Sequence, residues 1–297
     1  MIISLRCRLP LVGFLLLCVG LMHPGAHTAA ADKANTANMP ITTSVLSVAD
    51  VQWEKLNPAR GDASPQAGVL WGDLSEAVPT GFLAKFVDGF SSPPHAHNVT
   101  YRAVVISGLI HNDDPGASPM WMPPGSFWMQ PKGEVHITAA MGAENVALVE
   151  IDQGPYLVRP TKEAFDSGER PINIDPSNLV WQTPLGRAPD VDGPKQAFLW
   201  GALDKGTDNG TFIRLPAGFE GAIRAAGTTF RAVVISGRVR YASREPTELA
   251  PGSYFSSQGE FVHPLLAEGQ EPSIIYIRTD APYDLLGGKV DTFSASD

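Results

Sequence analysis

Residues 93–108 read PPHAHNVTYRAVVISG, and the last seven of them identify the architecture of the chain. The same seven residues, RAVVISG, recur at 231–237. Shorter identical stretches accompany the two copies in the same order: LWG at 70–72 and 199–201, GF at 89–90 and 218–219, and PGS at 124–126 and 251–253. Chance does not produce seven identical residues with further matches in register, so the sequence contains an internal repeat.

The repeat predicts two homologous domains, at 45–158 and 175–285, joined by a polar linker at 159–177. Each repeat contains short β-branched runs, such as Val104–Ile106 and Val146–Ile151, punctuated by Gly, Pro, Asn and Asp. The chain has 26 prolines and 29 glycines, which favour many short strands joined by turns. We therefore expect an all-β protein, built as a sandwich or small barrel in duplicate.

The N-terminus has the layout of a secretory signal peptide spanning 1–31. Arg6 and Arg8 precede an apolar run at 11–21 that is too short to span a bilayer, and Ala29–Ala31 offers small residues for cleavage. We predict cleavage after this last segment, which implies a periplasmic or secreted protein with no membrane attachment. An uncleaved anchor is the alternative.

Both cysteines of the chain, Cys7 and Cys18, lie in the predicted signal peptide. The mature protein would therefore have neither thiolate nor disulfide chemistry. Across the chain 31 acidic residues oppose 22 Lys and Arg, giving a formal net charge of −9. This acidic balance argues against nucleic acid or an anionic membrane surface as a partner.

Three histidines of the first repeat have the spacing of metal ligands. His95 and His97 are two residues apart on an extended segment, so both side chains point to the same face. His136 follows a Pro-x-Gly turn and joins them if its strand packs beside theirs. Neutral imidazoles in such a cluster bind divalent transition metals such as Zn, Ni, Mn, Cu or Fe(II). We predict one such metal, whose identity the residues do not determine.

These residues resemble the two-motif signature of the cupin superfamily. The matching positions are Gly89, His95, His97 and Gly108 in the first motif, and Gly125, Pro131, Gly133 and His136 in the second. The resemblance covers both repeats and implies a bicupin, that is, two jelly-roll barrels, with a metal inside a barrel. The chain is most similar to bacterial cupins of unsettled function, and more distantly to the cupin domain of zinc-containing anti-sigma factors. Cupins often dimerise through barrel edges, which makes a homodimer a candidate assembly.

Two further residues of the first repeat are candidates for the chemistry. Cupins commonly have a Glu where this chain has Tyr101, whose strand parity also directs it into the barrel. A neutral phenol is a poor ligand, so we expect a three-His site with an open position, where Tyr101 donates a hydrogen bond to substrate. Glu134 shares the strand parity of His136 and is a candidate fourth ligand or base.

The second repeat is expected to hold no metal. In register with RAVVISG, Arg224 and Ala226 stand opposite the first two histidines, while His263 aligns with His136. One imidazole does not hold a transition metal, and an arginine inside the barrel would repel a cation. The alternative is that Arg224 and His263 bind an anionic ligand. Lone histidines on strands, here His111 and His263, are otherwise expected in the core or on the surface.

Aromatic residues and methionines are concentrated at 120–129. Strand alternation divides this group between two faces, so half should pack in the core and the rest should line an apolar pocket beside the metal. Tryptophans recur in both repeats and are expected to be structural: Trp53, Trp71, Trp181 and Trp200.

Three functions are compatible with these features. An open three-His site indicates a metal-dependent enzyme, and the similarity to three-His cupins implies dioxygenase-like chemistry on a small oxygenated acid or diketone. The alternative is a non-catalytic module that binds or senses a metal or small ligand, in keeping with the anti-sigma resemblance. The third is a structural bicupin with a vestigial site.

Overall fold

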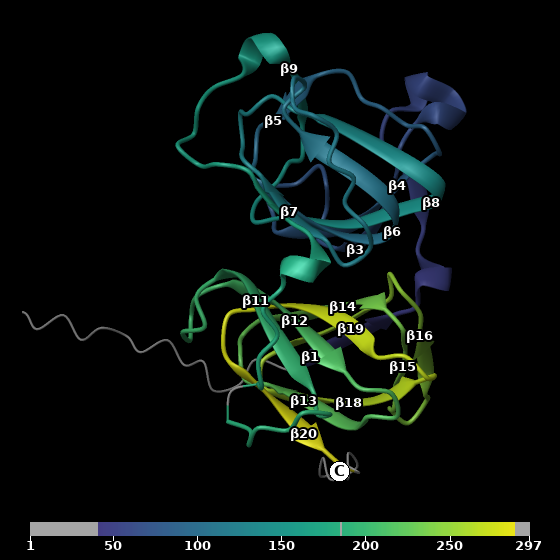
Figure 1. Ribbon diagram of the computed structural model, residues 1–297, viewed down its shortest axis with the longest axis vertical. Coiled ribbons are helices and arrows are strands. Elements are labelled where there is room, and N and C mark those ends of the chain that lie inside the picture. Colours follow the sequence, from purple (N-terminus) through teal and green to yellow (C-terminus); the bar gives the residue numbers. More distant parts are fainter. Residues whose placement is uncertain (1–40, 185, 289–297) are drawn as a thin grey trace, which may run out of the picture. The chain divides into compact units, whose positions relative to one another are not determined.

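The computed structural model describes residues 41–184 and 186–288 (Figure 1). The predicted signal peptide at 1–31 lies outside the described residues. None of the described helices has the length and apolar character needed to cross a membrane.

The described chain is almost entirely β, as expected from the sequence. The strands of its first half are β1 Thr42–Leu46, β2 Trp53–Lys55, β3 Gln66–Trp71, β4 Thr80–Phe86, β5 His95–His97, β6 Tyr101–Asp113, β7 Phe127–Gln130, β8 Ile137–Ile151, β9 Val158–Pro160 and β10 Ile172–Ile174. Those of the second half are β11 Lys195–Gly201, β12 Asn209–Leu215, β13 Glu220–Ala225, β14 Phe230–Ser236, β15 Arg238–Tyr241, β16 Thr247–Leu249, β17 Tyr254–Gln258, β18 Phe261–Glu268, β19 Ser273–Thr279 and β20 Tyr283–Gly287. Short 3-10 helices accompany them: η1 Val48–Asp50, η2 Pro58–Ala63, η3 Thr161–Glu163 and η4 Pro176–Asn178.

The strands form antiparallel sheets. The first repeat has a seven-stranded sheet, in the order β10-β7-β6-β8-β4-β3-β2, and a two-stranded ribbon of β5 and β9. The second repeat has a six-stranded sheet, β1-β17-β14-β19-β12-β11, and a five-stranded sheet, β16-β15-β18-β13-β20. Strand β1 precedes the first repeat in sequence but pairs with β17 of the second, while β10 from the predicted linker pairs with β7 of the first. Strand pairing therefore crosses between the repeats.

The central AVVI residues of the RAVVISG strands are apolar without interruption because both of their faces are buried. Ala103 and Val105 of β6 point into the core of the first repeat, and their counterparts in β14 point into that of the second. Val104 and Ile106 alternate with them and join a third cluster, which also contains Val233 and Ile235 of β14. A strand covered on both sides reads as a continuous apolar run, which accounts for the apolar residues of both copies.

Repeated Arg and Trp residues also meet between the two repeats. The guanidinium of Arg102 lies 3.8 Å from the ring centroid of Trp200, and that of Arg231 lies 5.3 Å from the ring centroid of Trp71. Each repeat thus supplies one cation and one indole to the other. This reciprocal contact accounts for the recurrence of Trp71 and Trp200 as structural residues.

Strands β6 and β8 contain a bulge, beyond which they pair again close to the histidine cluster. The pairing of β6 with β8 shifts register around Gly108, which has φ +75°. A Cβ at Gly108 would lie 2.1 Å from Oδ1 of Asn145, so only glycine fits there. Beyond the bulge, Asn112 of β6 pairs with Thr138 of β8. That pair lies close to the histidine cluster.

Candidate metal centre

The three predicted histidines of the first repeat come together. His95 and His97 are the two ends of β5, whose extended backbone places both on one face. His136, just before β8, forms an antiparallel bridge with His95, with N–H···O distances of 3.0 Å and 2.9 Å. One ring nitrogen of each histidine lies within 4.8 Å of those of the other two.

A backbone carbonyl accepts a hydrogen bond from Nδ1 of each imidazole. The carbonyl oxygens are those of Pro93 for His95 at 2.9 Å, Leu157 for His97 at 3.1 Å, and Glu134 for His136 at 3.2 Å. Because a carbonyl only accepts, Nδ1 carries the proton and the lone pair of each ring is on Nε2. This is the support that metal-binding histidines typically receive, and the donor set fits a divalent transition metal.

Burial keeps the cluster uncharged. His97 and His136 are almost fully buried, and His95 is partly buried. Burial lowers the pKa of all three imidazoles, that of His136 to about 3, and repulsion from its neighbours lowers the pKa of His97 further. The rings are therefore neutral near pH 7, which is the form that binds a metal.

Tyr101 lies against the cluster, as its strand parity predicts. Its hydroxyl oxygen is 3.3 Å from Nε2 of His136 and donates to Oδ1 of Asn112 at 2.8 Å. Asn112 is itself held, because Thr138 donates to the same oxygen at 2.8 Å and its Nδ2 donates to Gln130 at 3.0 Å. With its proton directed at Asn112, the phenol presents lone pairs to the centre. Tyr101 is thus arranged as a hydrogen-bond acceptor for a bound water or hydroxyl, whereas the sequence suggested a donor.

Tyr156, which precedes β9, is a second tyrosine of the site and is missed by the sequence analysis. Its ring stacks on His97 with centroids 4.4 Å apart, and its hydroxyl lies 3.2 Å from Nε2 of that histidine. Burial raises the pKa of both Tyr101 and Tyr156, so both are neutral phenols. The sequence does contain a feature that could have identified Tyr156, because Pro155-Tyr156 recurs as Pro282-Tyr283 in the second repeat.

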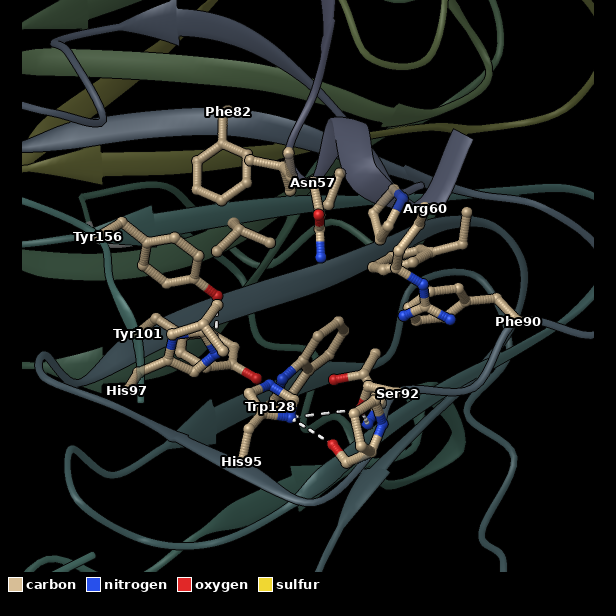
Figure 2. A pocket seen from close by; sticks show the side chains of 18 residues that line it. Asn57, Arg60, Phe82, Phe90, Ser92, His95, His97, Tyr101, Trp128 and Tyr156 are labelled. Carbon is tan, nitrogen blue, oxygen red and sulfur yellow. Dashed lines mark hydrogen bonds between the residues drawn. The ribbon is translucent and has the colours of Figure 1, made fainter. Parts of the chain in front are cut away.

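A pocket with a volume of about 310 Å³ opens on the cluster (Figure 2). Apolar side chains form most of its wall, among them Phe82, Phe86, Phe90, Trp128 and Val149. Of the aromatic and methionine residues at 120–129, Trp128 lines this wall, whereas the sequence predicts about half of the group there. The polar side chains of the wall are Asn57, Arg60, Ser92, His95, His97, Tyr101, Thr138 and Tyr156. The wall contains no carboxylate.

Comparison with known protein families identifies the chain. The family model described as a domain of unknown function, DUF4437, matches residues 44–286. The chain belongs to this family. Comparison with curated protein sequences finds no match.

Solved structures establish the fold. A Nostoc punctiforme protein assigned as a dioxygenase has a TM-score of 0.59 at 14% identity, with 86% of each chain covered. Salicylate 1,2-dioxygenase from Pseudaminobacter salicylatoxidans gives 0.54 at 15% identity, over 84% of this chain and 89% of that one. Oxalate decarboxylase from Bacillus subtilis gives 0.50 at 15% identity, over 82% and 78%. The DUF4437 chain therefore has the duplicated cupin jelly-roll fold, which confirms the predicted fold class. The resemblance to anti-sigma factors stays a prediction.

Glu134 does not join the histidines of the DUF4437 chain through its carboxylate. Its side chain lines a separate hollow with Phe165, Asp166 and Arg170, and the histidine cluster of the described residues does not include it. Burial raises the pKa of the Glu134 carboxyl, and the guanidinium of Arg170 opposes that shift. The contribution of Glu134 to the site is its backbone carbonyl, which accepts from His136.

The second repeat of the DUF4437 chain differs from the expected register by one residue. His263 pairs with Ile223, as His136 pairs with His95, so Ile223 and Ala225 occupy the positions of the first two histidines. The reason is an insertion: four residues separate Ala225 from Phe230, whereas three separate His97 from Tyr101. The expectation that Arg224 faces the barrel interior was therefore wrong.

Arg224 and His263 consequently lie on opposite faces and do not converge. Arg224 is exposed and pairs with Asp284. His263 is fully buried, with Nδ1 at 2.9 Å from the hydroxyl of Tyr241 and Nε2 at 3.0 Å from that of Ser257. It is a hydrogen-bonded core histidine, one of the roles considered for it.

His111 lies away from the cluster. It is buried on β6, with Nδ1 at 3.2 Å from the backbone nitrogen of Met120, and its ring faces Trp121. The described residues contain one histidine cluster suited to a metal, and neither His111 nor His263 belongs to it.

Proposed function

We propose that this protein is an exported enzyme that uses one divalent metal to act on a small oxygenated molecule, by dioxygenase-like or other metal-assisted chemistry. The observation that carries the proposal is the convergence of three imidazoles, each fixed through Nδ1, beside a pocket of about 310 Å³ that His95 and His97 line. The cupin fold supports it, since the most similar structures include a salicylate dioxygenase and an oxalate decarboxylase with Mn(II) centres. Export is supported by the signal-like segment at 1–31.

Each group of side chains in the site has a distinct role in the proposed reaction. A divalent metal would supply Lewis acidity and a position where a substrate oxygen can bind. His95, His97 and His136 would hold it, while Tyr101 accepts a hydrogen bond from the bound molecule. The apolar wall excludes water from the reacting group. Because the wall has no carboxylate, proton transfer would fall to the tyrosine hydroxyls or to water.

The same lack of a carboxylate favours a second candidate function. Both tyrosines of the site are neutral phenols, which are weak bases, and the wall contains no strong base. A site of this kind also suits a module that binds or senses a metal with its small ligand and performs no turnover.

Metal content is the first test of the proposal. Protein purified without chelators should carry about one divalent metal per chain, and His97→Ala should reduce this below about 0.2 because two imidazoles bind weakly. His111→Gln is the matched control, since His111 is equally buried but lies outside the cluster, and it should retain the metal. Metal-free native protein, or equal content in all three proteins, would contradict the proposal.

Turnover separates the two candidates. Anaerobically prepared protein loaded with Fe(II) should consume oxygen in the presence of a small oxygenated acid or diketone, and His97→Ala should not. Substrate-independent metal retention with no turnover on any loaded metal would instead support the binding module.

A further inference from the structure

Arg60 is the one charged residue in the wall of the metal pocket. It lies on η2, between β2 and β3, and is half-buried. Figure 2 shows Arg60 and Phe90 on the side of the pocket opposite His97 and Tyr156. The pocket therefore has a cationic end and a metal-binding end.

The protein holds the Arg60 guanidinium in place without neutralising it. The guanidinium carbon lies 4.9 Å from the ring centroid of Phe90, and Nη2 donates to the carbonyl oxygen of Ser91 at 3.3 Å. Within the described part of the chain, Arg60 forms no ion pair. By contrast, Arg102 and Arg278, which are more buried, both pair with Asp152. Most of the hydrogen-bonding capacity of Arg60 is left for a ligand.

The rest of the wall carries no charge opposite to that of the guanidinium. It is mostly apolar and contains no carboxylate. A free guanidinium on such a wall favours a ligand that accepts hydrogen bonds and carries negative charge.

We propose that the pocket binds an apolar monocarboxylate that carries a second oxygen group. Arg60 holds the carboxylate, the rings of Phe82, Phe86 and Phe90 contact the apolar body, and the second oxygen faces the histidines. This assignment names the substrate class of the proposed metal site. Only the position of the second oxygen, at the histidines, rests on the proposed function. Arg60 is thereby a specificity-determining residue.

The experiment compares carboxylates with their uncharged amides. The probes are 4-hydroxybenzoate and 3-(4-hydroxyphenyl)propanoate, each measured against its primary amide by calorimetric titration of metal-loaded and metal-free protein. Wild-type protein should prefer at least one carboxylate roughly 10- to 100-fold, because hydrogen bonds to charged groups contribute about 1.5–3 kcal/mol. Arg60→Met should bring this ratio close to one, mainly by weakening the carboxylate, and Arg60→Lys should restore part of it.

Arg214→Met is the matched control. Arg214 also lies over an aromatic ring, 4.8 Å from the centroid of Trp181, but outside the pocket wall, so this variant should keep the wild-type ratio. Equal affinity of wild-type protein for carboxylate and amide, an unchanged ratio in Arg60→Met, or no binding of any probe at about 10 mM would overturn the assignment.

The two proposals fail in different measurements. Arg60→Met should contain as much metal as wild-type protein, because Arg60 is not a ligand. A wild-type protein without metal would refute the proposed function, yet the Arg60-dependent preference would still be measurable in that protein. A metal-containing protein without the preference would refute the assignment of Arg60 alone.

Discussion

At the scale of single residues, some side chains of the site can be placed from sequence spacing, and others cannot. The spacing of His95, His97 and His136 is enough to predict the cluster, because period-two geometry and a turn fix where the imidazoles point. Tyr156 and Arg60 could not be predicted in the same way. Both lie outside the strands, Arg60 on the short helix η2 and Tyr156 in a loop, where contacts over long sequence distances and not strand parity decide the direction of a side chain.

Asn112 should matter for stability more than for metal content. Asn112→Leu leaves Tyr101, Thr138 and Gln130 without a shared partner in a buried place, so we expect a loss of about 2–4 kcal/mol in unfolding free energy, measured with denaturant. The metal content should stay near that of the wild type, since Asn112 is not a ligand. Thr138→Val removes one of these hydrogen bonds and should cost clearly less. A loss no larger than that of Thr138→Val would show that the network does not hold Tyr101.

His263 should make the protein sensitive to acid. Burial lowers its pKa to about 3 from the ordinary value of 6.5, so below pH 6.5 the unfolded chain binds the proton and the folded protein does not. The stabilisation is complete above pH 6.5 and is lost as the pH falls toward 3. Relative to His263→Gln, wild-type protein should lose about 1.4 kcal/mol between pH 7.5 and 5.5, measured with metal-free samples of both. Parallel pH curves for the two proteins would exclude a buried neutral imidazole.

At the scale of strands, the sequence predicts the long elements well and the short ones poorly. The RAVVISG strands are recognisable because they are apolar on both faces. Strands β5 and β9 have three residues each, too few for any periodicity, yet their pairing places Leu157 beside His97. An alignment with one constant spacing between the repeats cannot detect the one-residue insertion after Ala225. This insertion changes which residues face the interior of the second barrel.

A close contact between glycine and tryptophan recurs in both repeats, between Gly81 and Trp71 and between Gly210 and Trp200. A Cβ at Gly210 would lie 1.9 Å from Nε1 of Trp200, which donates to the hydroxyl of Tyr276 at 2.9 Å. Gly210→Ala should displace the indole and lower the unfolding free energy by about 1–3 kcal/mol. Gly287→Ala serves as control, because its Cβ would meet Arg187 at an ordinary 3.6 Å and should cost less than about 0.5 kcal/mol. Equal effects of the two changes would rule out the steric explanation.

At the scale of the whole molecule, a cluster of charges around one buried arginine joins the repeats. Arg278 of the second repeat, 3% exposed, lies 3.7 Å from Glu150 and 2.9 Å from Asp152 of the first, and also pairs with Asp208. Tyr276 adds a hydrogen bond to Glu150 at 2.7 Å. These ion pairs form only when both repeats are folded, so the described unit should lose its structure in one cooperative transition.

Removing the cation of this cluster should be costly. Arg278→Met leaves Glu150 buried without its counter-charge, and we expect a loss of about 3–5 kcal/mol in unfolding free energy, followed by calorimetry or denaturant titration. Arg240→Met removes a partly exposed pair with Glu268 and should cost less than about 1 kcal/mol. If both variants were equally stable, the cluster would contribute nothing to holding the repeats together.

The pairing of β1 with β17 has a consequence for how the chain folds. Thr42 and Gln258 are hydrogen-bonded although 216 positions separate them, so this edge of the second barrel cannot close until nearly the whole described chain is present. Closing so long a loop is entropically slow, and until it happens the edge of β17 is open to pairing with other chains. The first barrel, whose β6–β8 ladder is built from nearby residues, can form earlier. The last contact made in folding is therefore the one made by the first strand of the described chain.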